Sequence, residues 1–122
     1  MRRVIAAIVA MTTPALAAAD PVQTPGSNVT IATCHAQLDR PPLRIAYKNV
    51  APATATEVDF AIVDTTGVIA KVRDIGKFDP GTQINHVFGL PPDTSPLGLS
   101  SARCVVTKVV YGDGTAWTNP NP

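Results

Sequence analysis

The side chains best suited to chemistry in this sequence are its two cysteines and two histidines. In an oxidising compartment, Cys34 and Cys104 allow one intrachain disulfide, whereas in the reduced state they would be a reactive or metal-binding pair. The first nineteen residues predict export, which favours the disulfide. Because the bridge closes a segment of about 70 residues, it would stabilise the fold by about 4 kcal/mol in the chain-entropy model.

His86 is the more informative histidine, because it shares one face of a predicted strand with Ile84 and Phe88. Such a residue acts either as a ligand or general base, with Asp74 or Asp79 as its carboxylate, or as a half-buried histidine hydrogen-bonded at a sheet margin. The second role is the more common one. Hydrolases need a nucleophile, a histidine and an orienting acid, and no motif of that kind surrounds the serines. The sequence therefore predicts no catalytic residue.

The sequence also predicts no metal site and no cofactor. A copper electron carrier uses two histidines, a cysteine and usually a methionine. Met1 and Met11 both belong to the predicted signal peptide, so the mature chain has no methionine. Asp113 and Gly114 form the dipeptide typical of hairpin turns, and the other acidic ligands of a calcium loop do not follow.

Residues 1–19 have the pattern of a secretory signal peptide. Arg2 and Arg3 form a basic start, an apolar stretch follows, and small residues precede cleavage before Ala18 or Asp20. The alternative is an uncleaved N-terminal anchor, but the apolar run is far shorter than the roughly 20 residues of a spanning helix. We therefore predict a periplasmic or extracellular protein with no transmembrane anchor after cleavage.

The charge of the mature chain excludes one class of partner. Cleavage removes Arg2 and Arg3 from the 10 basic residues and leaves all 9 acidic ones. A chain this close to neutral lacks the basic surface of nucleic-acid-binding proteins. Roughly 100 residues remain, enough for one domain. The expected partner is a protein or a component of the cell envelope, and not a nucleic acid.

The mature chain is predicted to be all-β. Short runs rich in Val, Ile and Thr alternate apolar and polar residues with a period of two, as half-buried strands do. Turns about every 8–12 residues are typical of an antiparallel, immunoglobulin-like sandwich of about seven short strands. The predicted segments are a signal peptide (1–19), a flexible leader that buries nothing (20–28), the sandwich (29–118) and a flexible tail (119–122). The strands are expected at 29–36, from Leu43 through Tyr47, around Val58 to Ile62, at 68–75, 82–88 and 104–111, and in a short run ending at Trp117.

Residues 89–101 show no strand periodicity and are long for a loop in a compact domain. Irregular segments of this kind often bind partners. Leu90, Leu97 and Leu99 could contact a protein there, or they could cap the open end of the sandwich, which is the more common role.

The aromatic side chains divide into two groups. Those on predicted core faces are Tyr47, Phe60 and Phe88. Those left as candidate surface platforms for a ligand are Phe78, Tyr111 and Trp117.

Four short motifs resemble a pattern found in small exported bacterial proteins. Such proteins have an N-terminal signal, an immunoglobulin- or fibronectin-like sandwich, and no assigned activity. The resemblance spans residues 43–117 and implies the same fold without adding a catalytic residue. We therefore expect an exported, non-catalytic binding or structural module; the alternatives are a small enzyme or enzyme accessory that uses His86, and a metal-binding carrier. The motifs are Tyr47-Lys48-Asn49, Val58-Asp59-Phe60, Gly76-Lys77-Phe78-Asp79-Pro80-Gly81 with Ile84 and His86 following, and Tyr111-Gly112-Asp113-Gly114-Thr115-Ala116-Trp117.

Overall fold

The computed structural model describes residues 23–36, 43–89 and 102–121, and none of these is helical. The predicted signal peptide and Leu90, Leu97 and Leu99 lie outside the described residues. The all-β prediction is confirmed, and a strand is found in each expected place. The seven strands are β1 (Val29–Ala36), β2 (Leu43–Asn49), β3 (Ala55–Asp64), β4 (Gly67–Phe78), β5 (Gln83–Phe88), β6 (Arg103–Tyr111) and β7 (Ala116–Thr118).

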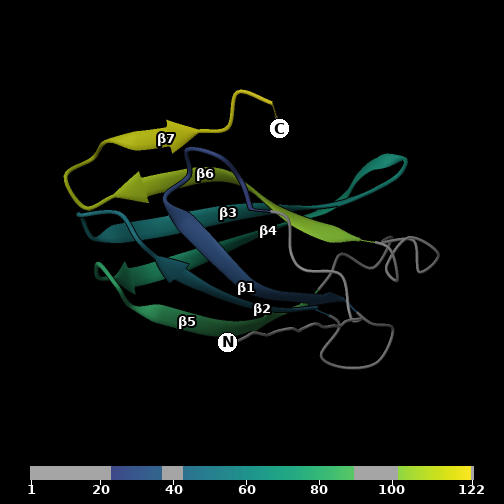
Figure 1. Ribbon diagram of the computed structural model, residues 1–122, viewed down its shortest axis with the longest axis horizontal. Coiled ribbons are helices and arrows are strands. Elements are labelled where there is room, and N and C mark those ends of the chain that lie inside the picture. The colour runs from purple at the N-terminus through teal and green to yellow at the C-terminus, as the bar shows by residue number, and fades with distance from the viewer. Residues whose placement is uncertain (1–22, 37–42, 90–101, 122) are drawn as a thin grey trace, which may run out of the picture.

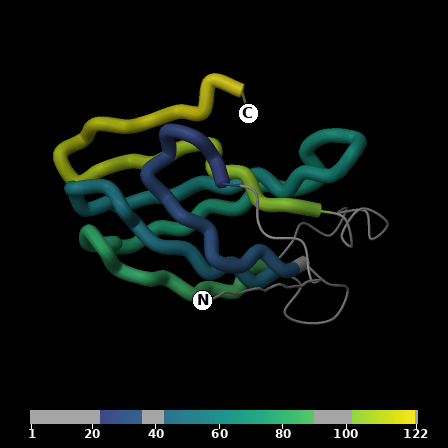
Figure 2. The backbone as a smooth tube through the Cα atoms, in the orientation of Figure 1, coloured from purple at the N-terminus to yellow at the C-terminus, as the bar shows by residue number. Residues whose placement is uncertain are grey.

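The strands form two antiparallel sheets packed as a sandwich (Figure 1). One sheet has the order β1-β2-β5, and the other has the order β4-β3-β6-β7. The tube in Figure 2 shows the chain passing repeatedly between the two layers. At one side of the sandwich β1 lies against β6, and at the other side β5 lies against β4.

The core lies between the central strands β2 and β3, as their alternating apolar residues predict. The ring of Tyr47 meets the ring of Phe60 edge to face, with ring centroids 5.1 Å apart. Offset and edge-to-face contacts of this kind add to the free energy gained by burying the rings. The large apolar side chains that are fully buried in these two strands are Leu43, Ile45, Tyr47, Val58, Phe60 and Ile62.

Two residues of β4 lie on faces that the sequence analysis did not assign to them. The period of two in the 68–75 run places Val68 on the face of Ala70 and Val72, opposite Lys71 and Arg73, yet Val68 is 48% exposed, because a register shift between Ile62 and Val63 interrupts the alternation there. Phe78 was expected to be a surface platform, and this was wrong: it is buried against Tyr47. The strand continues to Phe78 instead of ending near residue 75, so Phe78 keeps the inward face of Asp74.

The segment before β1 was expected to bury nothing, yet Thr24 and Ser27 are buried. The reason is that β7 is shorter than β6 and leaves Val106, which pairs with Phe60 of β3 on one side, without a strand partner on the β7 side. Thr24 Oγ1 accepts the Val106 N–H at 2.9 Å, and Asn119 Nδ2 donates to the Val106 carbonyl at 3.0 Å. Buried backbone groups need such partners, and polar side chains supply them here.

A disulfide joins Cys34 of β1 to Cys104 of β6, with Cα atoms 5.9 Å apart. The predicted pairing is confirmed. Because these strands belong to different sheets, the bridge ties the two layers together at the β1–β6 side.

Replacing both cysteines with alanine should lower the free energy of unfolding by about 4 kcal/mol, because the unfolded chain loses a closed loop of about 70 residues. Urea denaturation of the variant and of the wild-type protein would measure the difference. Wild-type protein unfolded in the presence of a reductant is the control and should show the same loss. A difference below about 1 kcal/mol would contradict the chain-entropy account.

Candidate functional site

Two groups of polar residues in the sandwich could serve a function. The first joins Tyr47 of β2, Asp74 of β4 and His86 of β5. Tyr47 Oη donates a hydrogen bond to Asp74 Oδ2 at 2.8 Å, and His86 Nδ1 lies 2.6 Å from the same oxygen. We call these three residues the clamp, because they connect the two sheets at the β4–β5 side.

The alternation of strand faces brings the clamp together. Asp74 is on the inward face of β4 and is only 5% exposed, whereas the His86 side chain is 48% exposed at the margin of the sheet. The His86 ring lies between the rings of Phe78 and Phe88, at centroid distances of 6.5 and 6.3 Å. The sequence analysis named Asp74 and Asp79 as candidate partners of His86, and the structure selects Asp74.

The electrostatics of the clamp depend on the buried carboxylate. Burial, the hydrogen bond to Asp74 and the negative charge of Asp74 together raise the pKa of the Tyr47 phenol far above its ordinary value. Tyr47 is therefore a neutral hydrogen-bond donor under all physiological conditions. With the carboxylate as acceptor, the hydrogen between His86 and Asp74 belongs on Nδ1, which leaves Nε2 directed away from Asp74.

An Asp–His pair of this kind can position a base, but the contacts of His86 are those of a structural histidine. No hydroxyl or thiol within the described ranges is hydrogen-bonded to its ring. Its neighbours are one carboxylate and two phenylalanine rings. The arrangement fits the expected half-buried histidine at a sheet margin and provides Asp74 with the partner that a buried charge requires.

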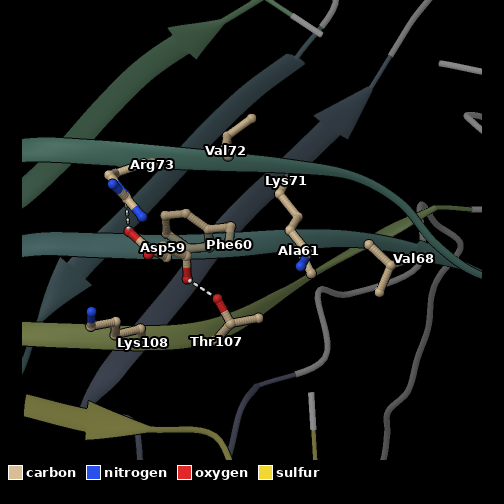
Figure 3. A pocket seen from close by; sticks show the side chains of 9 residues that line it. All are labelled: Asp59, Phe60, Ala61, Val68, Lys71, Val72, Arg73, Thr107 and Lys108. Atoms are coloured by element: carbon tan, nitrogen blue, oxygen red, sulfur yellow. Dashed lines mark hydrogen bonds and ion pairs between the residues drawn. The ribbon is translucent and has the colours of Figure 1, made fainter. Parts of the chain in front are cut away.

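The second group lines a hollow of about 660 Å³ on the outer face of the four-stranded sheet (Figure 3). The hollow lies over β3, where Ala61 faces outward between Lys71 of β4 and Val105 of β6. The Ala61 methyl group itself is buried, only 1% exposed. The charged residues around it are Asp59, Lys71, Arg73 and Lys108.

At one end of the hollow, Arg73 contacts two carboxylates. Its Nε donates a hydrogen bond to Asp59 Oδ1 at 3.3 Å and lies 3.2 Å from Glu57 Oε2. Nε has a single hydrogen, and because it is used for Asp59, the contact with Glu57 is electrostatic and leaves Oε2 buried without a hydrogen bond. Burial first, and then the hydrogen bond and charge of Glu57, raise the pKa of Asp59, while Arg73 opposes this shift.

The two lysines of the hollow stand on opposite sides of β3. In the sheet register, Lys71 is beside Ala61 and Lys108 is beside Asp59. Figure 3 shows the Lys71 side chain crossing toward β3 beside Ala61. Neither lysine has an ion-pair partner in ranges 23–36, 43–89 and 102–121. Their ammonium groups are therefore available to a ligand.

The sequence analysis did not propose this hollow. Alternation placed Glu57 and Asp59 on the polar face of β3, and Lys71 and Arg73 on that of β4. Ala61 is the small apolar residue in this part of β3, and it is covered in the structure, 1% exposed. The neighbourhood of Lys108 depends on the pairing of β3 with β6, which local sequence does not reveal.

Other functional elements can be stated briefly. Among the residues that are described, no three His, Cys, Asp or Glu side chains are grouped as metal ligands would be. None of the described residues belongs to a helix able to cross a membrane. Comparison with protein-family models, with curated proteins and with solved structures gave no match.

Replacing Tyr47 with phenylalanine should lower the free energy of unfolding by about 1–3 kcal/mol, because the buried Asp74 carboxylate loses one of its two hydrogen bonds. The raised pKa of Tyr47 also predicts that stability falls above about pH 10, where the unfolded chain loses the phenol proton first. That fall should be smaller in the variant. Urea denaturation at pH 7 and at alkaline pH would measure both effects.

Tyr111→Phe is the matched control for this experiment. Tyr111 is half-buried, and its hydroxyl makes no hydrogen bond within the described part of the chain. Its replacement should change the free energy of unfolding by less than about 0.5 kcal/mol. Equal losses in the two variants would contradict a special role for the clamp.

Replacing Asp59 with asparagine should raise the melting temperature at pH 7. Because the pKa of Asp59 is raised in the folded protein, folding favours the protonated carboxyl. The protonated carboxyl stabilises the fold below its ordinary pKa of about 4, and this stability is lost as the pH rises. The difference between variant and wild type should disappear at about pH 3, where the wild-type carboxyl is protonated in both states. Thermal unfolding over a series of pH values would measure it.

Asp64→Asn is the control with the opposite sign. Hydrogen bonds from the Thr66 hydroxyl and N–H hold the pKa of the exposed Asp64 below its ordinary value. Asp64 therefore contributes stability above about pH 4 that is lost on acidification. Its replacement should lower the melting temperature at pH 7, and a change in the same direction for both variants would contradict the assignment.

Proposed function

We propose that this chain is an exported, non-catalytic binding module with an immunoglobulin-like fold, which binds an acidic segment of a partner protein in the hollow over β3. The observation that carries the proposal is the pair of lysines, Lys71 and Lys108, which line a hollow of about 660 Å³ and make no ion pair with any residue that the structure describes. The disulfide and the predicted signal peptide support a periplasmic or extracellular location.

The strand order supports the immunoglobulin-like class. The first, second and fifth strands face the third, sixth and seventh, as in immunoglobulin domains. Here the fourth strand pairs with the third, whereas in the constant type it joins the first sheet. The disulfide also differs, since it starts from the first strand and not from the second.

The choice of ligand follows from charge and shape. Arg73 faces two carboxylates, Glu57 and Asp59. Because Lys71 and Lys108 add two positive charges, the formal charge of these five residues together is positive. The floor is apolar, and Phe60 beneath it is fully buried, which leaves no aromatic ring on which a sugar could stack. An extended chain carrying two carboxylates fits this surface better than a neutral sugar does.

Binding of a fluorescein-labelled hexaglutamate peptide, measured by fluorescence anisotropy at low salt, tests the proposal. Lys71→Glu together with Lys108→Glu should weaken binding about tenfold or more, equivalent to about 1.4 kcal/mol. Asp59→Asn should strengthen binding, because it removes a negative charge from the hollow. The affinity should decrease with added salt.

Lys48→Glu is the control, because Lys48 is exposed on β2 in the other sheet and its replacement changes the net charge as much as either single replacement in the hollow does. It should alter the affinity less than about twofold. Amide shifts in ¹⁵N-labelled protein should concentrate at residues 59–61 and 71–73. No binding by the wild-type protein, or equal weakening by Lys48→Glu, would refute the proposal.

We propose a structural role, and not a catalytic one, for His86. Its 2.6 Å contact with Asp74 balances a buried charge between two sheets, and the Tyr47 hydrogen bond on the same oxygen serves the same end. An enzyme that used His86 as a base would lose its activity in His86→Gln with little loss of stability. The clamp predicts the reverse, a folded variant with lowered stability and unchanged binding of the peptide.

A further inference from the structure

We infer that β5 is the interface of a homodimer, in which the β5 strands of two copies pair antiparallel and join two three-stranded sheets into one. The inference does not depend on the hollow over β3. It rests on a comparison of the four sheet edges and on the direction of the β5 backbone groups. An unpaired edge strand is a template for pairing with another chain, and proteins usually protect such edges.

Three of the four sheet edges have features that hinder pairing with another chain. On β1, the Gln23 side chain accepts the Ile31 N–H at 2.7 Å and donates to the Ile31 carbonyl at 2.8 Å, in the manner of a missing strand. β7 is only three residues long. β4 carries Lys71, Arg73 and Lys77, and a register shift opposite Ala55 and Glu57 bends it.

β5 has none of these devices within the described residues. It contains no Lys, Arg, Asp, Glu or Pro, and it pairs with β2 residue for residue without a shift. Figure 1 shows it as the outer strand of its sheet. Val87 is 51% exposed there.

Hydrogen bonds at the end of β2 show which β5 groups face outward. Asn49 donates to the Thr82 carbonyl and accepts from the Gly81 N–H, whereas the next residue, Val50, bonds Asn28 on the β1 side. These directions alternate along an antiparallel strand, so the backbone groups of Tyr47 and Ile45, like those of Asn49, point toward β5. They form hydrogen bonds with the backbone groups of Ile84 and His86, their partners in the register.

The backbone groups of the intervening β5 residues must then point to the free edge. None of them is hydrogen-bonded within the described residues beyond the sheet itself. The residues concerned are Gln83, Asn85 and Val87.

A second copy matches this edge without conflict. Antiparallel pairing about a two-fold axis at Asn85 places Asn85 opposite itself, Gln83 opposite Val87 and Ile84 opposite His86. All outward N–H and C=O groups then find partners, and the two Asn85 amides lie side by side on the solvent face of the joined sheet. No like charges meet, whereas self-pairing of β4 would bring its lysines and arginine together.

The oligomeric state of the processed chain tests the inference. Sedimentation velocity should show a dimer that dissociates on dilution. Asn85→Lys places two positive charges directly opposite each other and should raise the dissociation constant about tenfold or more. Val50→Lys is the matched control, because Val50 is 49% exposed, like Val87, but lies outside β5; its dissociation constant should equal that of the wild type.

A covalent test fixes the register. Opposed residues of a hydrogen-bonded antiparallel pair have Cα atoms about 5.5 Å apart, within the range of about 4.4–6.8 Å for a disulfide. Asn85→Cys should therefore form a disulfide-linked dimer under mild oxidation, and Lys71→Cys on the β4 edge should not. A wild-type monomer at all concentrations up to about 1 mM, or a dimer that Asn85→Lys leaves intact, would overturn the inference.

Discussion

A small sandwich has two open sides, and the structure of this protein depends on how each is closed. At the β1–β6 side the closure is covalent, through Cys34 and Cys104. At the β4–β5 side it is polar, through a buried carboxylate of β4 that receives hydrogen bonds from Tyr47 and His86 of the other sheet. A domain of roughly 100 residues buries only a modest share of its surface, so both closures matter to the two-layer arrangement.

The two closures differ in what they demand of their surroundings. The disulfide stabilises the fold by reducing the conformational entropy of the unfolded chain, and this effect depends little on the residues around it. The clamp depends on the burial of Asp74 between the two sheets, where water does not take the place of its hydrogen-bond partners. A buried ion costs free energy unless it is paired. Tyr47 serves both the apolar core and this polar network, since its ring packs on Phe60 while its hydroxyl reaches Asp74.

The hollow proposed for binding is separate from both closures, whereas the β5 edge carries His86 of the clamp. The hollow lies on the outer face of the four-stranded sheet, and the free edge belongs to the three-stranded sheet. A dimer formed through β5 would leave the outer face over β3 of each copy unobstructed by β5 itself, because the two features belong to different sheets. Two hollows on one particle would allow bivalent binding of an acidic partner, which increases avidity without new contacts.

Much of the fold was predictable because period-two alternation and turn residues act locally. The faces of β2 and β3 follow from their sequences alone, and so does the turn at Gly81, whose positive φ of 83° suits glycine. Because the chain has only two cysteines, one intrachain disulfide is possible. The misassignments of Val68 and Phe78 have a local cause too: a register shift, and a strand that ends three residues later than expected.

The site was less predictable, since its members meet only through pairing between strands distant in sequence. The sequence offered two carboxylates for His86, and the packing of β4 against β5 chose Asp74. The sequence did not predict that Thr24 and Asn119 would form hydrogen bonds with the backbone of Val106. The backbone groups of Val106 lack partners on this side only because β7 ends short of β6. Sequence by itself determined the strands, most of their faces and the disulfide. Tertiary structure decided which polar groups share a buried oxygen and, among the described residues, which lysines make no ion pair and which sheet edge has no partner strand, because each depends on register between strands.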